Sequence, residues 1–181
     1  MTSILQVDAP ILREKARGVP ENLFGTKKLA RMIADMGEAL DRERDGVALA
    51  APQIGLPYRI FIVRYDRTLP IEEGAAPPEA RVGVYINPKI VKKSRRTEEM
   101  DEGCLSVRGI YGKTYRYNRT TVRAQDENGV TFVRGGGGLL AQIFQHETDH
   151  LEGILFTDHA IDLYEFYPDE TEISYDKKHT T

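Results

Sequence analysis

The residues of this chain most suited to chemistry are His146, Glu147 and His150, which form an H-E-x-x-H pattern. The apolar spacing around them predicts a helix that is apolar on nearly every side and therefore buried. Residues four apart on a helix share a face, so both imidazoles can bind one divalent ion while the glutamate reaches a water on that ion. Such an arrangement is typical of metal-assisted hydrolysis, although a five-residue pattern also arises by chance.

A catalytic metal of this kind needs a third protein ligand, and the sequence offers few candidates. The position six residues after His150 is Phe156, which excludes the pattern with a third histidine there. His159 lies just past the expected helix end. Three glutamates lie further downstream in a segment rich in charge and without a helical apolar stripe: Glu165, Glu170 and Glu172. Cys104 remains, and a thiolate with two imidazoles leaves the open position that a catalytic metal requires.

Cys104 is the only cysteine of the chain, so it cannot form an internal disulfide. A single thiol without a secretory signal favours a reducing, cytoplasmic setting. A lone cysteine often serves as a small buried apolar residue. Its neighbours Glu102, Gly103 and Ser106 are not those of a plain core strand, which favours the role of a ligand.

A third segment, residues 46–55, joins a run of small residues to the amide side chain of Gln53. Small residues let the backbone of a ligand approach closely, and Gln53 can donate a hydrogen bond to a developing oxyanion. A tightly packed turn with a surface glutamine is the alternative interpretation of this segment.

Together, these segments resemble the three motifs of the peptide deformylase family: G-x-G-x-A-A-x-Q, E-G-C-L-S and Q-H-E-x-D-H-L-x-G. The second and third are complete, and the resemblance covers roughly residues 4–158. Ala48 stands where the first motif has its second glycine, and Arg108 stands where a proline usually follows the second motif. Metal binding is expected to survive both changes, whereas catalytic efficiency and peptide preference depend on them.

The resemblance implies that residues 1–163 form a catalytic domain that removes the N-formyl group from the initiator methionine of nascent peptides. Cys104, His146 and His150 would hold one metal, which the resemblance implies is Fe(II); Zn(II), Ni(II) and Co(II) also suit these ligands. Glu147 would transfer protons, while Gln53 and the backbone N–H of Leu105 would stabilise the oxyanion. The ribosome near its exit tunnel is a candidate partner, because the substrate is an N-formylmethionyl nascent peptide.

Further residues are expected around this centre. The substrate pocket would be lined by Gly46, Val47, Ala48, Gly103, Tyr111, Leu139 and Ile143. Hydrogen bonds that orient the ligands would come from Glu102, Arg116 and Asp149. In an extended segment, side chains alternate, so Ala48 would point away from the side that Val47 and Leu49 share.

Two other functions remain open from the sequence. A zinc endopeptidase would need an open groove without preference for formylated N-termini. A non-catalytic or less active metal-binding homologue would agree with Ala48 and Arg108, but metal binding alone requires neither Glu147 nor Gln53.

Composition agrees with a single domain of 181 residues whose formal net charge is -3. This balance gives no global basic field and predicts no sequence-specific binding of nucleic acid. The basic cluster at residues 92–96 is interpreted as a solvated strand end. No run of residues is long enough for a membrane helix, and no signal pattern opens the chain.

The expected fold is α+β, with mixed or antiparallel sheets around a buried helix that carries H-E-x-x-H. An amphipathic helix is expected at residues 26–44, and strands at 59–63, 82–86, 89–91, 120–125 and 130–134. Asn128-Gly129 predicts a hairpin turn between the last two strands. Residues 68–79 are expected to form a surface loop, residues 135–138 a flexible turn without a phosphate-binding role, and residues 164–181 a loosely held tail.

Overall fold

The computed structural model describes residues 3–68 and 79–166. Within these ranges, strands form two sheets, and every strand pair is antiparallel. The five-stranded sheet has the order β1-β2-β3-β6-β7, with bounds Ala48–Ala50, Ile60–Arg64, Val82–Lys93, Arg119–Gln125 and Thr131–Gly137. The three-stranded sheet has the order β4-β5-β8, with bounds Thr97–Cys104, Val107–Tyr117 and Ile161–Glu165. The α+β architecture is as the sequence predicted.

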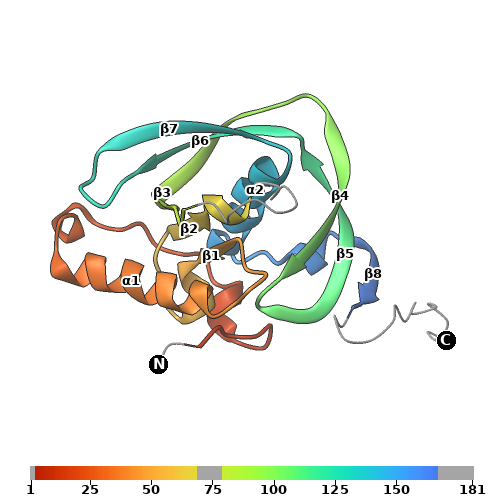
Figure 1. Ribbon diagram of the computed structural model, residues 1–181, viewed down its shortest axis with the longest axis horizontal. Coiled ribbons are helices and arrows are strands. Elements are labelled where there is room, and N and C mark those ends of the chain that lie inside the picture. Colours follow the sequence, from red (N-terminus) through yellow and green to blue (C-terminus); the bar gives the residue numbers. More distant parts are fainter. Residues whose placement is uncertain (1–2, 69–78, 167–181) are drawn as a thin grey trace.

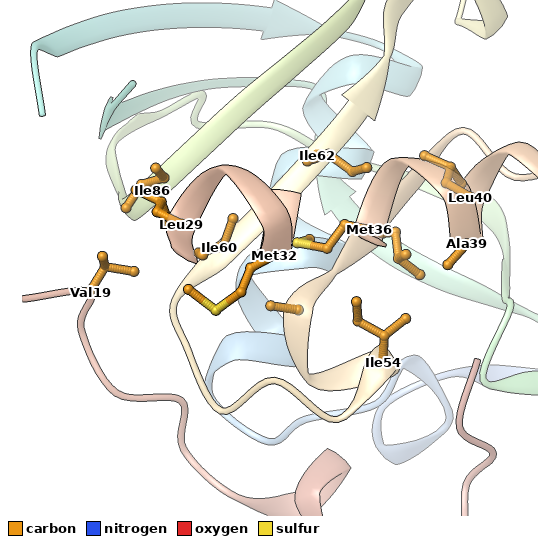
Figure 2. Packing of buried hydrophobic residues seen from close by; sticks show 12 residues of the cluster. Val19, Leu29, Met32, Met36, Ala39, Leu40, Ile54, Ile60, Ile62 and Ile86 are labelled. Atoms are coloured by element: carbon orange, nitrogen blue, oxygen red, sulfur yellow. The ribbon is translucent and has the colours of Figure 1, made fainter. Parts of the chain in front are cut away.

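Helix α1, Lys27–Asp41, covers one side of the five-stranded sheet (Figure 1). It begins after Thr26, whose hydroxyl oxygen accepts the backbone N–H of Leu29 at 3.2 Å and so caps the first turn. Its apolar stripe contacts β2 and the short 3-10 helix η3, Ala51–Ile54, as Figure 2 shows for Met36, Ile54 and Ile62. Burying each such side chain contributes about 1.5–3 kcal/mol, which holds α1 against β2 and η3.

Helix α2, Leu139–Leu151, lies between the two sheets (Figure 1) and packs against strands of both. Its Phe144 is fully buried and meets Phe61 of β2 and Tyr85 of β3. The rings of Phe61 and Tyr85 stack with centroids 4.6 Å apart. These aromatic contacts hold the helix that carries the H-E-x-x-H pattern in one position on the sheet.

The hairpin of β6 and β7 turns at Gly129, whose φ of +81° suits the turn that Asn128-Gly129 predicted. Two expectations about this sheet are wrong. Residues 82–86 and 89–91 form one irregular strand, β3, which has register shifts between Ile86 and Lys89 and between Ile90 and Lys92. Residues 135–137 belong to β7, and only Gly138, with a φ of +54°, turns the chain into α2.

The long β4–β5 hairpin was not predicted, and it carries Cys104 at the end of β4. Strand β8 extends the same sheet and includes Tyr164 and Glu165, so the boundary expected at residue 163 falls inside a strand.

Residues 167–181 of the expected tail and most of the expected loop at 68–79 lie outside the described residues. The remaining short 3-10 helices are η1, η2, η4 and η5, with bounds Pro10–Arg13, Glu21–Leu23, Tyr65–Arg67 and Phe156–Asp158. In the described ranges, no helix is both long and apolar enough to cross a bilayer.

Candidate active site

Three side chains with metal-binding atoms converge where β4 ends against α2. Cys104 Sγ lies 3.2 Å from His150 Nε2, which lies 3.1 Å from His146 Nε2. All three atoms lie within 4.8 Å of one another. One cation can therefore contact a sulfur and two imidazole nitrogens, a donor set suited to zinc or to first-row transition metals.

The other candidates for the third ligand do not join this cluster. His159 Nε2 lies 3.6 Å from a carboxylate oxygen of Asp149 instead, and Glu165 pairs with Ile110 at the edge of the β4-β5-β8 sheet. Glu170 and Glu172 lie outside the described residues. Among the residues that are described, the only group of three or more potential ligands this close together is the Cys104 cluster.

A buried ionic network surrounds the cluster. Glu102 accepts two hydrogen bonds from Arg116, from Nη2 at 2.6 Å and from Nε at 2.9 Å. It accepts a third from the Thr114 hydroxyl at 2.5 Å, and its Oε1 lies 2.6 Å from His146 Nδ1. Arg116 also donates to Asp149 at 2.6 Å. The contacts expected for Glu102, Arg116 and Asp149 are thus present, and they fix the His146 ring with Nε2 toward Cys104.

The charges of this network shift the pKa values of the two histidines in opposite directions. Burial lowers the pKa of His146, but hydrogen bonds to the Cys104 sulfur and the Glu102 carboxylate outweigh burial and raise that pKa well above its usual range. Burial, aided by the charge of His146, holds the pKa of His150 well below its usual range, which favours the neutral form that binds metals. Burial would raise the pKa of Glu102, yet its bonds to His146 and Arg116 hold that pKa far below its usual range.

Glu147 lies beside the cluster with 3% of its surface exposed and faces the same cavity. Its Oε2 and the Nδ1 of His150 are buried side-chain atoms without a hydrogen-bond partner among the described residues. Burial raises the pKa of Glu147 to about 7. A carboxyl group with this pKa can both take and give a proton near neutral pH.

The amide of Gln53 is oriented by the chain around it. Its Oε1 accepts the backbone N–H of Ala50 at 2.8 Å, so its NH₂ group must point the other way. That nitrogen lies 3.1 Å from Ser106 Oγ and 3.6 Å from Cys104 Sγ. Gln53 is 2% exposed, which contradicts the alternative of a surface glutamine.

A cavity of about 640 Å³ opens beside these groups. Its walls include every residue expected in the pocket: Gly46, Val47, Ala48, Gly103, Tyr111, Leu139 and Ile143. Leu105 also lines it.

Ala48 was expected to point away from a side shared by Val47 and Leu49. This expectation is wrong, because β1 starts only at Ala48 and the alternation of a strand does not extend to Val47. Val47 and Ala48 both belong to the cavity side, whereas Leu49 is buried under α1.

Several lining residues were not assigned to the pocket from the sequence, although the charge of Arg108 was expected near the cleft. Gln142 lies four residues before His146 on α2, a spacing that could have identified it, and its amide donates to the Asp101 carbonyl at 2.8 Å. Phe166 follows β8 and packs edge-on against the ring of Tyr111, with centroids 5.7 Å apart. Arg108 forms a salt bridge of 2.7 Å with Glu43 across the cavity rim. The contact of Phe166 depends on the pairing of β8 with β5 and leaves no local signal in the sequence.

An α+β domain that brings a thiol, two imidazoles and a buried carboxylate together in one cleft has the donor groups of a possible metal site in a hydrolase. The profile of the polypeptide deformylase family matches residues 1–165, and the chain belongs to this family. A peptide deformylase from Heliobacterium modesticaldum is 41% identical over 156 residues, covering 86% of this chain and 91% of that protein.

Solved structures agree with this assignment. A Met-Ala-Ser-bound class I type b peptide deformylase from Acinetobacter baumannii has a TM-score of 0.75 and 31% identity, covering 86% of this chain and 96% of that one. A plant peptide deformylase has a TM-score of 0.77 and 34% identity, covering 89% of this chain and 81% of that one.

Proposed function

We propose that this chain is a metal-dependent amide hydrolase that removes the N-formyl group from the initiator methionine of nascent peptides. The observation that carries the proposal is the placement of Cys104, His146 and His150 within 4.8 Å of one another beside a buried carboxylate with an unpartnered oxygen. Membership of the peptide deformylase family supplies the formyl group, which geometry alone does not identify.

The donor set fits one divalent metal, held by Cys104 Sγ and the Nε2 atoms of His146 and His150. When bound, such a metal supplies Lewis acidity, which polarises a carbonyl and makes a water more acidic. Fe(II) is the proposed metal, and Zn(II), Ni(II) and Co(II) also match a sulfur with two imidazoles. Metal analysis of protein purified without oxygen identifies which ion is present.

Glu147 is the proposed general base and acid. Its raised pKa lets the carboxylate take a proton from the attacking water near neutral pH. The same carboxyl then returns the proton to the departing amine of the peptide. Its burial beside the cavity keeps the proton from exchanging with bulk solvent during the reaction.

Gln53 and Leu105 are proposed to stabilise the oxyanion. The Gln53 amide donates to Ser106 Oγ at 3.1 Å and to Cys104 Sγ at 3.6 Å, and the longer contact is the one that would give way to the substrate oxygen. Because the Ala50 N–H holds the opposite end of the amide, the donor is oriented before substrate arrives. The Leu105 carbonyl accepts Gln6 Nε2 at 3.1 Å, which fixes the backbone whose N–H would be the second donor.

The methionine side chain is proposed to bind against Val47, Leu139 and Ile143, apolar residues of the cavity wall. The relative that binds Met-Ala-Ser supports a peptide of this kind in the cleft. A nascent substrate also implies the ribosome near its exit tunnel as a partner and a cytoplasmic location.

Two matched substrates test the reaction. A formyl-Met peptide should be hydrolysed at least about 100-fold faster than the corresponding acetyl-Met peptide. The proposed donors, Gln53 and Leu105, lie so close to the metal-binding atoms that the cleft should admit a hydrogen on the acyl carbon but not a methyl group. Equal rates on the two, or cleavage of internal peptide bonds, would contradict the proposal.

Variants separate metal binding from proton transfer. Glu147→Gln should bind about one metal per chain yet lose turnover by about 100-fold or more. Cys104→Ala should lose most of the metal, while the control His159→Ala keeps it. Full metal content in Cys104→Ala, or near-normal turnover in Glu147→Gln, would remove that residue from its proposed role.

A further inference from the structure

Two features of the sequence have no role in the cleft: the basic cluster at residues 92–96 and the glycine run at residues 135–138. They lie far apart in the chain, yet the five-stranded sheet brings them together. Strand β6 lies between β3 and β7, with Thr121 opposite both Lys92 and Gly135. Arg119 lies opposite Gly137, and its carbonyl accepts the N–H of Ser94 in the turn after β3.

These residues share the outer face of the sheet. On β6, Thr120, Val122 and Ala124 are buried, so Arg119, Thr121 and Arg123 point outward. Residues directly opposite each other in antiparallel strands lie on the same face, which adds Lys89 opposite Arg123 and Lys92 opposite Thr121. The turn after β3 adds two more exposed cations at its edge. We call the resulting set the basic face: Lys89, Lys92, Arg95, Arg96, Arg119 and Arg123.

The basic face is unusual in its charge balance. Strands β3, β6 and β7 contain no aspartate or glutamate, although the whole chain has 28 acidic residues against 25 lysines and arginines. Lys89 and Arg123 stand directly opposite each other, a pairing of like charges that destabilises a sheet. The chain thus concentrates positive charge here at a cost to its own stability.

These six cations also lack ion-pair partners among the residues that the structure describes. All six are exposed, and none forms an ion pair with another residue in the described ranges. Elsewhere the chain does pair its surface cations, as Lys113 with Glu99 and Lys15 with Glu152. The basic face is therefore free to neutralise an external polyanion.

We propose that the basic face binds the phosphate backbone of RNA without reading its sequence. Cations spread over two strands and a turn can contact successive phosphates along a flat surface. Gly135 and Gly137 carry no side chains on the outer face, which allows a bulky backbone to approach the sheet at its edge strand. Backbone contacts fix position without specifying bases, so binding of this kind requires no element that reads the sequence.

RNA fits this face better than a membrane does. A surface that inserts into lipid presents large apolar side chains among its cations. The apolar residues exposed on these three strands within the described ranges are three valines: Val82, Val91 and Val133. The choice of RNA also rests on the proposed function, since a nascent peptide is met beside the RNA of a ribosome.

A triple variant that removes three positive charges from the basic face tests the proposal: Lys92→Gln, Arg119→Gln and Arg123→Gln. The matched control removes the same charge from α1 with Lys27→Gln, Lys28→Gln and Arg31→Gln. Binding to an RNA duplex of about 20 base pairs is measured across a range of salt concentrations. Losing three phosphate contacts should weaken binding at least about tenfold and make its dependence on log salt shallower by about 2–3, whereas the control should bind like the original chain.

Two results would overturn the proposal. One is equal loss in both triple variants, which would indicate net charge rather than this face. The other is binding of polyglutamate or of anionic vesicles at least as tight as binding of RNA. Formyl-peptide turnover, measured in parallel, should be unchanged in the face variant, because none of its three residues lines the cavity. Absence of turnover in the original chain would contradict the proposed function and leave the RNA result to be judged separately.

Discussion

Replacement of Glu102 by glutamine probes the network that holds the active site. The glutamine has nearly the same shape but no charge, so it changes the electrostatics with little change in packing. In the original chain, Glu102 is 3% exposed in its side chain and faces Arg116, which is 7% exposed. The variant would leave the Arg116 guanidinium buried with Asp149 as its remaining carboxylate.

The magnitude follows from this burial. Removing one partner of a buried ion pair costs about 3–5 kcal/mol, and the lower end applies here because Asp149 still faces Arg116. Loss of the carboxylate that holds His146 Nδ1 should also weaken metal affinity by about 10–100-fold. We therefore expect Glu102→Gln to lower the free energy of unfolding by about 3 kcal/mol and to weaken metal binding separately.

Urea unfolding of the metal-free protein measures the first effect, and a competition titration with a chelator measures the second. The control is Glu99→Gln on the same strand, which removes an exposed carboxylate paired with Lys113. Exposed pairs contribute little, so this variant should resemble the original chain in both assays. If Glu102→Gln and Glu99→Gln unfold alike, the buried network does not stabilise the site as argued.

Three further outcomes are expected. Phe166→Ala should raise the KM of formyl-Met peptides about 2–10-fold, because an aromatic wall of the cavity is lost. Leu163→Ala, in the strand β8 that precedes Phe166 but outside the cavity, should leave KM unchanged, and equal effects of the two variants would refute a direct role for Phe166. Ala48→Gly should change kcat/KM by less than about tenfold, since Ala48 is only 7% exposed, and a gain of a hundredfold would show that its methyl group obstructs the cavity. Asp66→Asn should destabilise the protein by roughly 2 kcal/mol at neutral pH, because a hydrogen bond from Arg64 lowers the pKa of Asp66 to about 2. This contribution is present above the unfolded pKa and is lost as pH falls from about 4 to 2, so unfolding measured across that range should show the two proteins converging.

The helix of the active site could be predicted because its signal is local. The spacing of His146, Glu147 and His150 and the apolar residues around them specify a buried helix with its ligands on one face. Cys104 could be identified by elimination and by its neighbours. Gln53 was already a candidate hydrogen-bond donor, and the family motifs favoured this role over a surface glutamine. No local pattern indicates its burial.

The β4–β5 hairpin escaped prediction for a physical reason. Strands are recognised by alternating apolar residues, but the buried positions of this hairpin include Glu102, Thr114 and Arg116. These polar residues form hydrogen bonds with each other across the two strands, a pairing that neither strand shows alone.

The glycines of β7 were misread as a turn for a related reason. A Cβ at Gly136 would lie 2.9 Å from Leu140 and 3.0 Å from Phe144, so the strand needs glycine to let α2 approach.

The same polar contacts explain how the cleft can exist before a metal binds. Glu102 on β4 joins Arg116 on β5 and His146 on α2, and Gln53 joins η3 to Ser106 at the turn between β4 and β5. These bonds connect the elements that supply the three metal-binding atoms, so the ligands need little rearrangement when a cation arrives. Less of the binding energy is then spent on ordering the chain. We therefore expect that the proposed divalent metals could replace one another with little change in the shape of the centre, because the geometry is set by the buried network.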